Sequence, residues 1–490
     1  QRGGAGEDEA AHTGRGGLFG QLPRRLHVTA FERRIAGPAD VRRVQRRDVH
    51  DGVDALQRRA GQHRVGDVAD ERGRRRRRPI QADHRVLVGQ AHGDRTADGI
   101  GAEVIADPAV EAMADEGLDH RHQLSSGELV DDRSQGVQLA TLRELARYWT
   151  TEYDWRKCEA RLNALPQFTT EIDGVEIHFI HVRSRHENAL PLIMTHGWPG
   201  SVIELLETVG PLTDPTAHGG AAEDAFHLVL PSLPGYGFSA VPAELGWDAS
   251  RTARAWAELM HRLGYTRYVA QGGDVGALVT DLMGRQAVEG LVGYHLNLLT
   301  AVLAIGDQLP KESEQERAAA EALATFRQDG FGYFLEMATR PQTIGYALLD
   351  SPVALAAWLL DHDTDSYYKI SRAFVDGEPV GNLTRDTIVD NITLYWLTGT
   401  AASAARSYWE DGRALAAAIA SGQAPPPVTV PVGFTSFPGE IYGVAPRSWV
   451  EIVYPDLAYF NEVDRGGHFA AWEEPELFSA EVRAAFSSLR

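Results

Sequence analysis

The chain has 490 residues, which exceeds one typical domain, and a formal net charge of −20 at pH 7. This acidic balance argues against nucleic acid or an anionic membrane as a partner. The sequence has no run of 18 apolar residues, so no membrane-spanning helix is expected, and its N-terminus lacks the apolar core of a signal peptide. Because Cys158 is the single cysteine, an internal disulfide is excluded and a reducing, cytoplasmic compartment is expected.

Residues 1–135 differ in composition from the rest of the chain. They hold 23 Arg, 23 Asp and Glu together, no Lys, and two aromatic side chains, Phe19 and Phe31. Such a segment cannot bury enough apolar surface to offset chain entropy. The run Arg74–Arg78 resembles a nucleic-acid patch, but acidic residues elsewhere in the segment neutralise it. The same composition is typical of GC-rich DNA translated outside its true frame or start. We therefore expect 1–135 to be disordered or spurious, and the functional protein to begin near Gly136.

From residue 136 onward, helices and strands are predicted in a regular order. Residues 136–190 form an N-terminal region, with near-helical apolar spacing over 137–165 and then a hairpin around Asp173-Gly174. Residues 191–300 alternate strands with helices, which favours a parallel α/β sheet. The predicted strands of this part are 190–195, 226–230, 268–270 and 292–298, and the predicted helices are 201–209, 252–263 and 277–284.

The pattern changes to helices only over residues 301–410, with predicted helices at 312–326, 331–337, 353–361, 385–398 and 402–410. Residues 411–490 return to the α/β pattern, with a strand at 428–435, a further element at 449–453 and a closing helix at 475–489. A helical block within an α/β chain is typical of a lid inserted above the carboxyl edge of the sheet, where such sheets bind ligands. The predicted fold class is α/β, with a mostly parallel central sheet and an all-helical lid.

Asp274 lies in the sequence Gln-Gly-Gly-Asp-Val-Gly-Ala, directly after the predicted strand 268–270. A strand, a glycine-flanked reactive side chain and a helix make up a nucleophile elbow, in which the glycines tolerate a sharp turn. The usual occupant is serine. A carboxylate suits attack on saturated carbon and suits ester or amide hydrolysis poorly. Taken alone, an Asp between glycines is more often an ordinary turn residue, so the interpretation depends on the other motifs.

The turn His196-Gly197-Trp198-Pro199-Gly200-Ser201 follows the predicted strand 190–195. A turn at this place can aim a backbone N–H at the nucleophile, and the second donor would be the N–H of Val275. The alternative is a plain Pro-Gly turn, but the position favours an oxyanion hole. We expect the Trp198 N–H to be the donor here, with His196 and Pro199 bordering the substrate pocket.

A histidine and an acid near the C-terminus complete the order found in hydrolases with an elbow. His468 stands in Arg-Gly-Gly-His-Phe, before the last predicted helix, and Glu440 stands in Phe-Pro-Gly-Glu, just beyond the strand 428–435. A strand-end carboxylate can fix the tautomer of an imidazole, which then takes a proton from water. A lone histidine is usually structural, so the chain order carries this interpretation. Topology favours Glu440 over four other acids, Glu451, Asp456, Glu462 and Asp464.

Two tyrosines of the predicted lid, Tyr333 and Tyr395, are candidates for acids. Buried tyrosines are mostly core residues with a satisfied hydroxyl. If both hydroxyls point at Asp274, they form an acid pair of pKa about 10, suited to stabilising a strained-ring oxygen as it becomes an alkoxide.

These motifs together resemble the microsomal-type epoxide hydrolases. The resemblance runs from about Val137 to Arg490 and is specific, because separate motifs fall in the family order. They are GGDVG around Asp274, HGWPGS at 196–201, PGYGFS at 234–239, FPGE at 437–440, RGGHFAA at 465–471, and the helical segment with Tyr148-Trp149 and Tyr153-Asp154-Trp155-Arg156.

The resemblance implies an α/β-hydrolase fold that converts epoxides to vicinal diols through a covalent ester. It implies Asp274 as nucleophile, Glu440 and His468 as the charge-relay pair, and Tyr333 and Tyr395 as donors to the epoxide oxygen. The partners implied are a small-molecule epoxide and water, with no metal or organic cofactor. It also suggests detoxification or aromatic hydrocarbon catabolism and a possible homodimer.

Two departures from the family pattern stand out. Val275 occupies a position where such families usually carry Trp, so the pocket wall loses an aromatic face. The first strand and helix of the family's N-terminal region are absent or replaced by residues 1–135, which puts stability and dimerisation in question. The membrane anchor of some relatives has no counterpart.

Two rival functions remain open. A haloalkane dehalogenase also uses an Asp nucleophile and a His base, but it needs halide-binding donors, usually tryptophans, where this chain has Val275 and two lid tyrosines. Halide release from a chloroalkane without diol from styrene oxide would favour it. The other rival is a non-catalytic binding protein on the same scaffold, which the retained functional side chains argue against.

Overall fold

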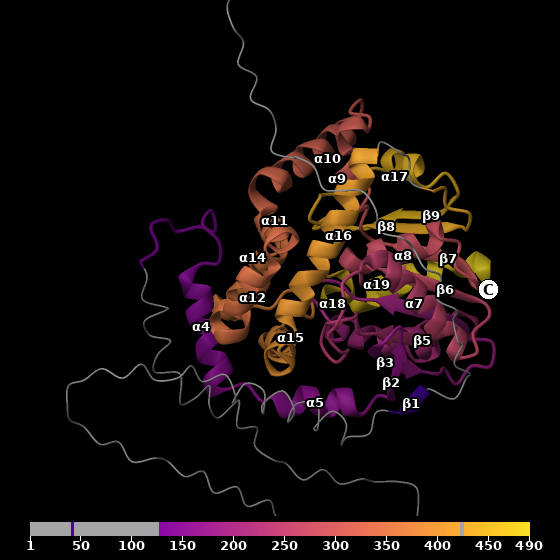
Figure 1. Cartoon of the computed structure of the whole chain (residues 1–490), viewed down its shortest axis with the longest axis horizontal. Helices are drawn as coiled ribbons and strands as arrows, with labels where there is room; N and C mark the ends of the chain where they lie inside the picture. The colour runs from indigo at the N-terminus through magenta and orange to yellow at the C-terminus, as the bar shows by residue number, and fades with distance from the viewer. Residues whose placement is uncertain (1–40, 44–126, 422–425) are drawn as a thin grey trace, which may run out of the picture. The chain divides into compact units, whose positions relative to one another are not determined.

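Figure 1 shows the computed structural model of the chain, which describes residues 41–43, 127–421 and 426–490. The unit Asp40–Arg490 is built on one sheet with the strand order β1-β2-β3-β5-β4-β6-β7-β8-β9. Its strands are β1 (Val41–Arg43), β2 (Gln167–Ile172), β3 (Val175–Val182), β4 (Leu190–Thr195), β5 (Phe226–Pro231), β6 (Tyr268–Gly272), β7 (Leu291–Leu296), β8 (Val432–Ser436) and β9 (Leu457–Glu462).

The sheet is antiparallel at one edge and parallel elsewhere. β1, β2, β3 and β5 pair antiparallel in that order, whereas β5, β4, β6, β7, β8 and β9 are parallel neighbours. The β2–β3 hairpin turns at Asp173 and Gly174, which both have positive φ, as the Asp-Gly pair predicts. The central parallel strands are buried along nearly their whole length, because helices or lid cover both of their faces.

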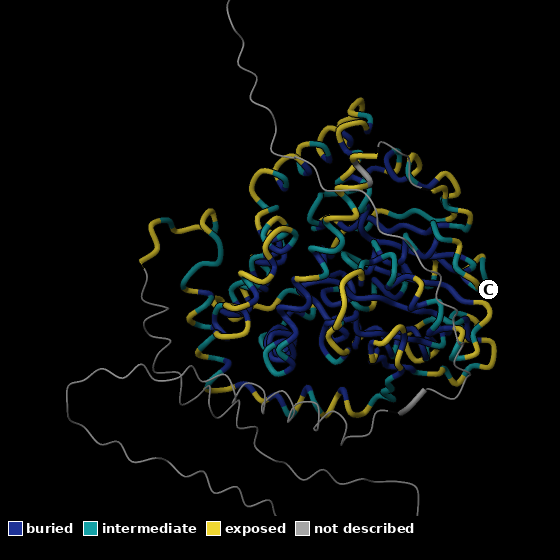
Figure 2. Tube along the Cα trace, in the orientation of Figure 1, coloured by how far each residue is buried: buried dark blue, intermediate teal, exposed yellow. Residues whose placement is uncertain are grey.

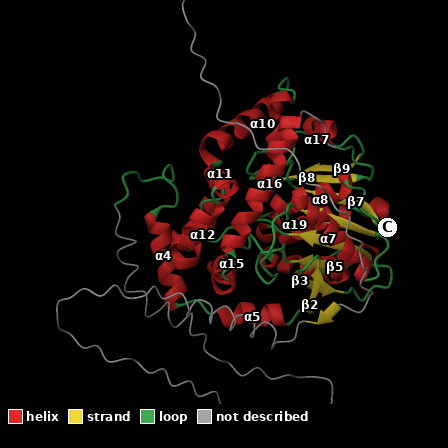
Figure 3. Ribbon diagram, in the orientation of Figure 1, coloured by secondary structure: helices red, strands yellow, loops and turns green. Residues whose placement is uncertain are grey.

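Helices flank this sheet (Figure 3). α7 (Ala249–Arg262) packs against α8 (Asp274–Arg285), and α8 lies on β6 and β7. α6 (Val209–Thr213) contacts β5, and α19 (Pro475–Ala485) contacts β8 and β9. Figure 2 shows the strands at the buried centre and the outward faces of the surrounding helices exposed.

The lid lies between β7 and β8 in the chain, as predicted. α16 packs along both α11 and α12, and α13 and α14 contact α15. Its α-helices are α9 (Val302–Ile305), α10 (Glu314–Thr325), α11 (Gly332–Thr339), α12 (Pro341–Asp350), α13 (Pro352–Leu360), α14 (Thr364–Val375), α15 (Arg385–Thr398) and α16 (Ala401–Ser421).

The N-terminal helices α4 (Leu139–Thr151) and α5 (Trp155–Asn163) pack on the lid. The Tyr148 hydroxyl donates to Asp386 of α15, and the Tyr153 hydroxyl donates to Asp390 of the same helix at 2.7 Å. Through these two hydrogen bonds, Tyr148 and Tyr153 attach the N-terminal helical region to α15 of the lid.

Several predicted boundaries require correction. The single helix predicted over 137–165 breaks at 152–154, where Asp154 accepts a hydrogen bond from the Arg156 N–H and caps α5. The helix predicted at 201–209 is a 3-10 helix, η1 (Val202–Thr208), followed by α6. α12, α14 and β9 were not predicted.

The segment 1–135 is only partly described. Arg133 donates to Asp361 at 2.8 Å, and β1 pairs with β2, so the folded part of the chain begins before Gly136. The expectation that residues 1–135 are disordered or spurious otherwise concerns residues 1–40 and 44–126, which lie outside the described part of the chain. Among the helices that are described, none combines the length and apolar character of a membrane span.

Candidate active site

The turn between β6 and α8 carries Asp274. Its φ is 49°, in the left-handed region that few residues other than glycine adopt. A Cβ on Gly276 would lie 2.0 Å from the carbonyl oxygen of Thr195, and one on Gly272 would lie 2.1 Å from the carbonyl oxygen of Gly276. The two glycines therefore allow the strand, turn and helix to pack closely, which is the arrangement of a nucleophile elbow.

Backbone N–H groups lie beside the Asp274 carboxylate. The Trp198 N–H donates to Asp274 Oδ1 at 2.8 Å. A Cβ on Gly197 would lie 2.4 Å from Asp274 Cβ, so glycine at this position lets the turn after β4 approach the nucleophile. The Val275 N–H belongs to the first turn of α8, where N–H groups have no partner within the helix. The turn thus supplies one donor, and the Val275 N–H stays the predicted second donor.

His468 lies between Glu440 and Asp274. Its Nδ1 is 2.5 Å from Glu440 Oε1, and its Nε2 is 3.4 Å from Asp274 Oδ2. Glu440 follows β8 and His468 follows β9, and these parallel neighbours end at the same edge of the sheet. A bridge between Gly439 and Gly467 holds the two loops together. The pairing predicted from chain order is therefore present as a geometric triad.

Charge sets the ionisation of this triad. Burial raises the pKa of Asp274, but the hydrogen bond and charge of His468 outweigh burial and hold that pKa below its ordinary value. Burial lowers the pKa of His468, but the charges of Glu440 and Asp274 raise it well above its ordinary value. At neutral pH the site therefore holds the Asp274 carboxylate beside an imidazolium.

Tyr395 does not direct its hydroxyl into the site, which corrects the prediction. The hydroxyl donates to the carbonyl oxygen of Gly200 at 2.6 Å, so its one proton is already engaged. Its ring packs edge-on against Trp198, with centroids 5.1 Å apart. Tyr395 therefore supports the turn that carries the Trp198 N–H, rather than a reacting oxygen.

The second lid hydroxyl near the nucleophile belongs to Tyr408 of α16. The rings of Tyr333 and Tyr408 lie 6.2 Å apart, and the Tyr408 hydroxyl is buried without a hydrogen-bond partner among the described residues. Burial, and then the charge of Asp274, raise the pKa of both phenols well above the ordinary value. Both groups are therefore protonated donors at neutral pH.

His196 and Pro199, which were predicted to border the substrate pocket, do not line the described cavity at Asp274. His196 is fully buried; its Nδ1 donates to the carbonyl oxygen of Gly197 at 2.9 Å, and its Nε2 accepts from the Leu233 N–H at 3.1 Å. Burial lowers the pKa of His196 to about 4, so the ring is neutral. The Pro199 carbonyl accepts from Asn391 at 2.7 Å. Both residues stabilise the turn.

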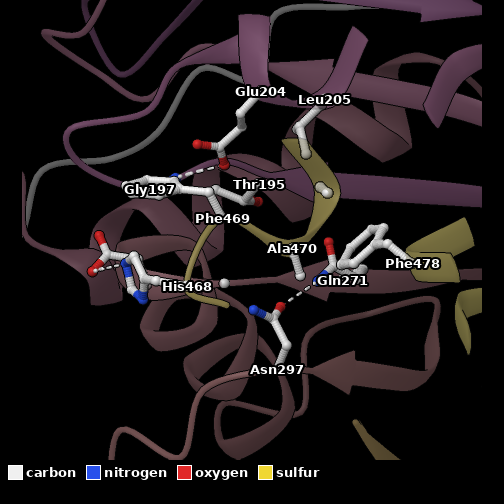
Figure 4. Close-up of a pocket in the computed structure, with 13 residues that line it drawn as sticks. Thr195, Gly197, Glu204, Leu205, Gln271, Asn297, His468, Phe469, Ala470 and Phe478 are labelled. Carbon is white, nitrogen blue, oxygen red and sulfur yellow. Dashed lines mark hydrogen bonds and ion pairs between the residues drawn. The ribbon is translucent and has the colours of Figure 1, made fainter. Parts of the chain in front are cut away.

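A small cavity lies against Asp274 and His468 (Figure 4). Glu204 reaches it from η1 and accepts a hydrogen bond from the Gly197 N–H at 3.3 Å. Burial, and then the charge of Asp274, raise the pKa of Glu204 to about 8. The other lining residues are Thr195, Gly197, Leu205, Gln271, Gly273, Asn297, Phe469, Ala470, Ala471 and Phe478. The cavity is therefore partly polar on the side from which water would approach the nucleophile.

His362 is a site residue that sequence reasoning missed. It lies between α13 and α14, and its Nε2 is 3.9 Å from Asp274 Oδ2. Its ring lies 4.7 Å from those of both Tyr333 and His468. The signal available in the sequence was the triplet Asp361-His362-Asp363 in the predicted lid. Asp274, His362 and His468 are also the group of described residues that could hold a metal ion.

The family described as "Epoxide hydrolase N terminus" matches residues 108–205 of the chain. The match begins upstream of Gly136, inside the segment 1–135. It covers α4, α5 and the turn with Trp198, and ends in η1.

Whole-chain comparisons extend this likeness. A Stigmatella aurantiaca protein provisionally named an epoxide hydrolase is 52% identical over 368 residues, 74% of this chain and 79% of the relative. Epoxide hydrolase 1 of rabbit, Oryctolagus cuniculus, is 38% identical over 366 residues, 71% of this chain and 80% of the relative. The Aspergillus niger epoxide hydrolase structure is 32% identical, with a TM-score of 0.65 over 80% of this chain and 96% of that one.

Proposed function

The chain belongs to the epoxide hydrolase family, and on this premise we propose which of its residues open the ring and which release the product. Asp274 attacks the less hindered ring carbon, so that a carbon–oxygen bond forms to the carboxylate as the ring bond breaks. The observation that carries this proposal is the convergence of the Trp198 N–H and the His468 imidazole on the two oxygens of Asp274. The Trp198 N–H holds Asp274 Oδ1 in place, and the charge of His468 beside Oδ2 keeps the carboxylate ionised.

Tyr333 and Tyr408 hydrogen-bond the epoxide oxygen in this proposal. Ring opening places a negative charge on that oxygen, and a phenol donates the proton that makes it a hydroxyl. The unpartnered Tyr408 hydroxyl and its closeness to Tyr333 support the pair, because a buried donor without a partner is costly unless a ligand satisfies it.

The second step hydrolyses the ester. The tyrosinate left by ring opening first takes the extra proton from His468. The neutral imidazole, held by Glu440, then removes a proton from water, and the hydroxide attacks the Asp274 carbonyl carbon. The N–H groups of Trp198 and Val275 stabilise the oxyanion, each worth roughly 3–4 kcal/mol. Collapse releases the diol and restores the Asp274 carboxylate beside the protonated His468. The cavity that both Asp274 and His468 border is where we place the water.

Substituting Tyr408 and Tyr395 in turn shows which of the two hydroxyls donates to the epoxide oxygen together with Tyr333. We expect Tyr408→Phe to lower kcat/KM for styrene oxide about 10²-fold, because it removes a proton donor that acts on the ring oxygen. Tyr395→Phe removes a hydrogen bond to a backbone carbonyl instead, so we expect a loss of about 1–3 kcal/mol in unfolding free energy and less than about a tenfold change in kcat/KM. Diol formation and urea unfolding measure both effects. A larger loss of kcat/KM in Tyr395→Phe than in Tyr408→Phe would show that Tyr395 is the donor after all.

The finer expectations stay predictions. We propose that the protein works in the cytoplasm, that it forms a homodimer, and that its substrates include aryl epoxides met in detoxification or aromatic hydrocarbon breakdown. The aromatic rings of Tyr333, Tyr408 and Phe334, which pack together in the lid, support an aromatic substrate, because such rings stack or meet edge to face.

A further inference from the structure

A second imidazole–carboxylate pair faces the nucleophile from the lid. The Nδ1 of His362 is 3.3 Å from Asp363 Oδ2, and Asp363 also caps α14 by accepting from the Ser366 N–H at 2.8 Å. His362 is 3% exposed, and its Nε2 is buried without a hydrogen-bond partner in the described part of the chain. The hydrolysis described above uses neither residue. A buried imidazole nitrogen therefore faces Asp274 and has no part in the proposed hydrolysis.

The three nitrogen and oxygen atoms around Asp274 have the spacing of a metal site. Zn²⁺ holds histidine nitrogens and carboxylate oxygens at about 2.0–2.2 Å in a tetrahedron, which puts two ligand atoms about 3.4 Å apart. Asp274 Oδ2 is 3.4 Å from His468 Nε2 and 3.9 Å from His362 Nε2, and all three atoms lie within 4.8 Å of one another. A movement of the His362 ring toward Asp274 Oδ2 and His468 Nε2 completes the spacing.

The groups behind the two imidazoles match a metal site as well. A metal-ligating histidine usually donates its other ring N–H to a carboxylate, which orients the ring and raises its basicity. Glu440 provides that carboxylate for His468, and Asp363 provides it for His362. With Asp274, three carboxylates surround one point, so a divalent cation there is favoured by charge. Two imidazoles and one carboxylate suit Zn²⁺ and disfavour Mg²⁺ and Ca²⁺, which take oxygen ligands.

We propose that Asp274, His362 and His468 bind one Zn²⁺ ion, with water in the fourth position, and that the bound ion shuts off hydrolysis reversibly. Binding releases the proton of the His468 imidazolium to solvent. The metal then occupies the Asp274 oxygen that attacks the epoxide and the His468 nitrogen that accepts a proton from water. Binding does not depend on the proposed function, whereas the inhibition rests on it.

The full chain is first treated with a chelator and then titrated with Zn²⁺ in a calorimeter, which measures binding. The visible absorption spectrum of the Co²⁺-substituted protein tests the coordination geometry. We expect one ion per chain and the visible bands of tetrahedral Co²⁺. His362→Phe keeps a ring between Tyr333 and His468 but removes the ligand atom, and it should weaken Zn²⁺ binding at least tenfold. His362→Gln serves as the second variant if the first does not fold. Asp363→Asn should weaken Zn²⁺ binding about 10–100-fold.

The controls are two surface imidazole–carboxylate pairs. His218 lies 3.1 Å from Glu476, and His186 lies 3.4 Å from Asp214. His218→Gln and His186→Gln should leave the stoichiometry and affinity unchanged. Affinity that survives His362→Phe, or that is lost in a surface variant, would show an adventitious ion only and overturn the proposal.

An activity assay separates this inference from the function on which its inhibition rests. We expect Zn²⁺ to inhibit diol formation, a chelator to restore it, and His362→Phe to raise the half-inhibiting Zn²⁺ concentration at least tenfold relative to the parent. If the metal-free protein forms no diol, the proposed function fails while the titration still decides the metal site. If Zn²⁺ binds through His362 but does not inhibit, the regulatory half of the inference is overturned.

Discussion

Replacing His468 by glutamine is expected to give a protein that consumes one equivalent of epoxide and then stops. Ring opening needs Asp274 and the phenols, whereas hydrolysis of the ester needs a base 3.4 Å from the nucleophile, which glutamine cannot supply. We expect steady-state turnover to fall about 10³-fold or more. Intact-protein mass after exposure to styrene oxide should increase by the mass of the substrate, and peptide mapping should place the adduct on Asp274.

His295 offers a matched control for this variant. It is fully buried like His468, and its Nε2 contacts the Thr435 hydroxyl at 2.9 Å rather than a nucleophile. His295→Gln is therefore expected to turn over without an adduct. A His468→Gln protein that releases diol repeatedly at the parent rate would contradict its assignment as the base. Adduct on a residue other than Asp274 would contradict the covalent route.

Asp274→Asn is expected to remove both steps. The amide oxygen and nitrogen do not attack an epoxide carbon at a useful rate, so no ester should form and kcat/KM should fall by at least about 10³-fold. Asparagine suits this test because it tolerates the left-handed conformation, and Asp274 has a φ of 49°. The loss should therefore come from chemistry and not from strain, with an unfolding free energy close to that of the parent.

Asp173 provides the control for backbone geometry. Its φ is 50°, but it stands in the β2–β3 hairpin and is well exposed. Asp173→Asn should form diol at the rate of the parent protein, and its intact mass after exposure to styrene oxide should match that of the parent. Undiminished diol formation by Asp274→Asn, with its identity verified by mass, would refute a covalent intermediate.

The scaffold of the site was predictable because its local signals are strong. Glycines around Asp274 need a close strand–helix turn, and the structure gives each a neighbour that a Cβ would strike. Glu440 and His468 follow successive strands, and parallel neighbours bring their ends together, so chain order predicts their meeting. The Asp-Gly hairpin likewise depends on two residues that accept positive φ.

The lid contacts were harder to predict, because they depend on how helices rotate against one another. Tyr395 and Tyr408 both stand on lid helices with similar neighbours in sequence. α15 is buried nearly all round, so apolar spacing does not indicate which side faces the nucleophile. His362 lies in a loop, and only the packing of α13 and α14 carries it to Asp274. β9 was missed because its apolar run, Leu457–Phe460, is only four residues long and lacks the apolar–polar alternation of a half-buried strand.

Isotope labelling in water enriched in ¹⁸O tests the covalent route most directly. In a single turnover with enzyme in excess, the diol should contain no ¹⁸O, because its new oxygen comes from the Asp274 carboxylate. After many turnovers, the label should be found in that carboxylate, since water attacks its carbonyl carbon. Diol that carries ¹⁸O from the first turnover, with the Asp274 peptide unlabelled, would show that water attacks the epoxide directly and would contradict the account.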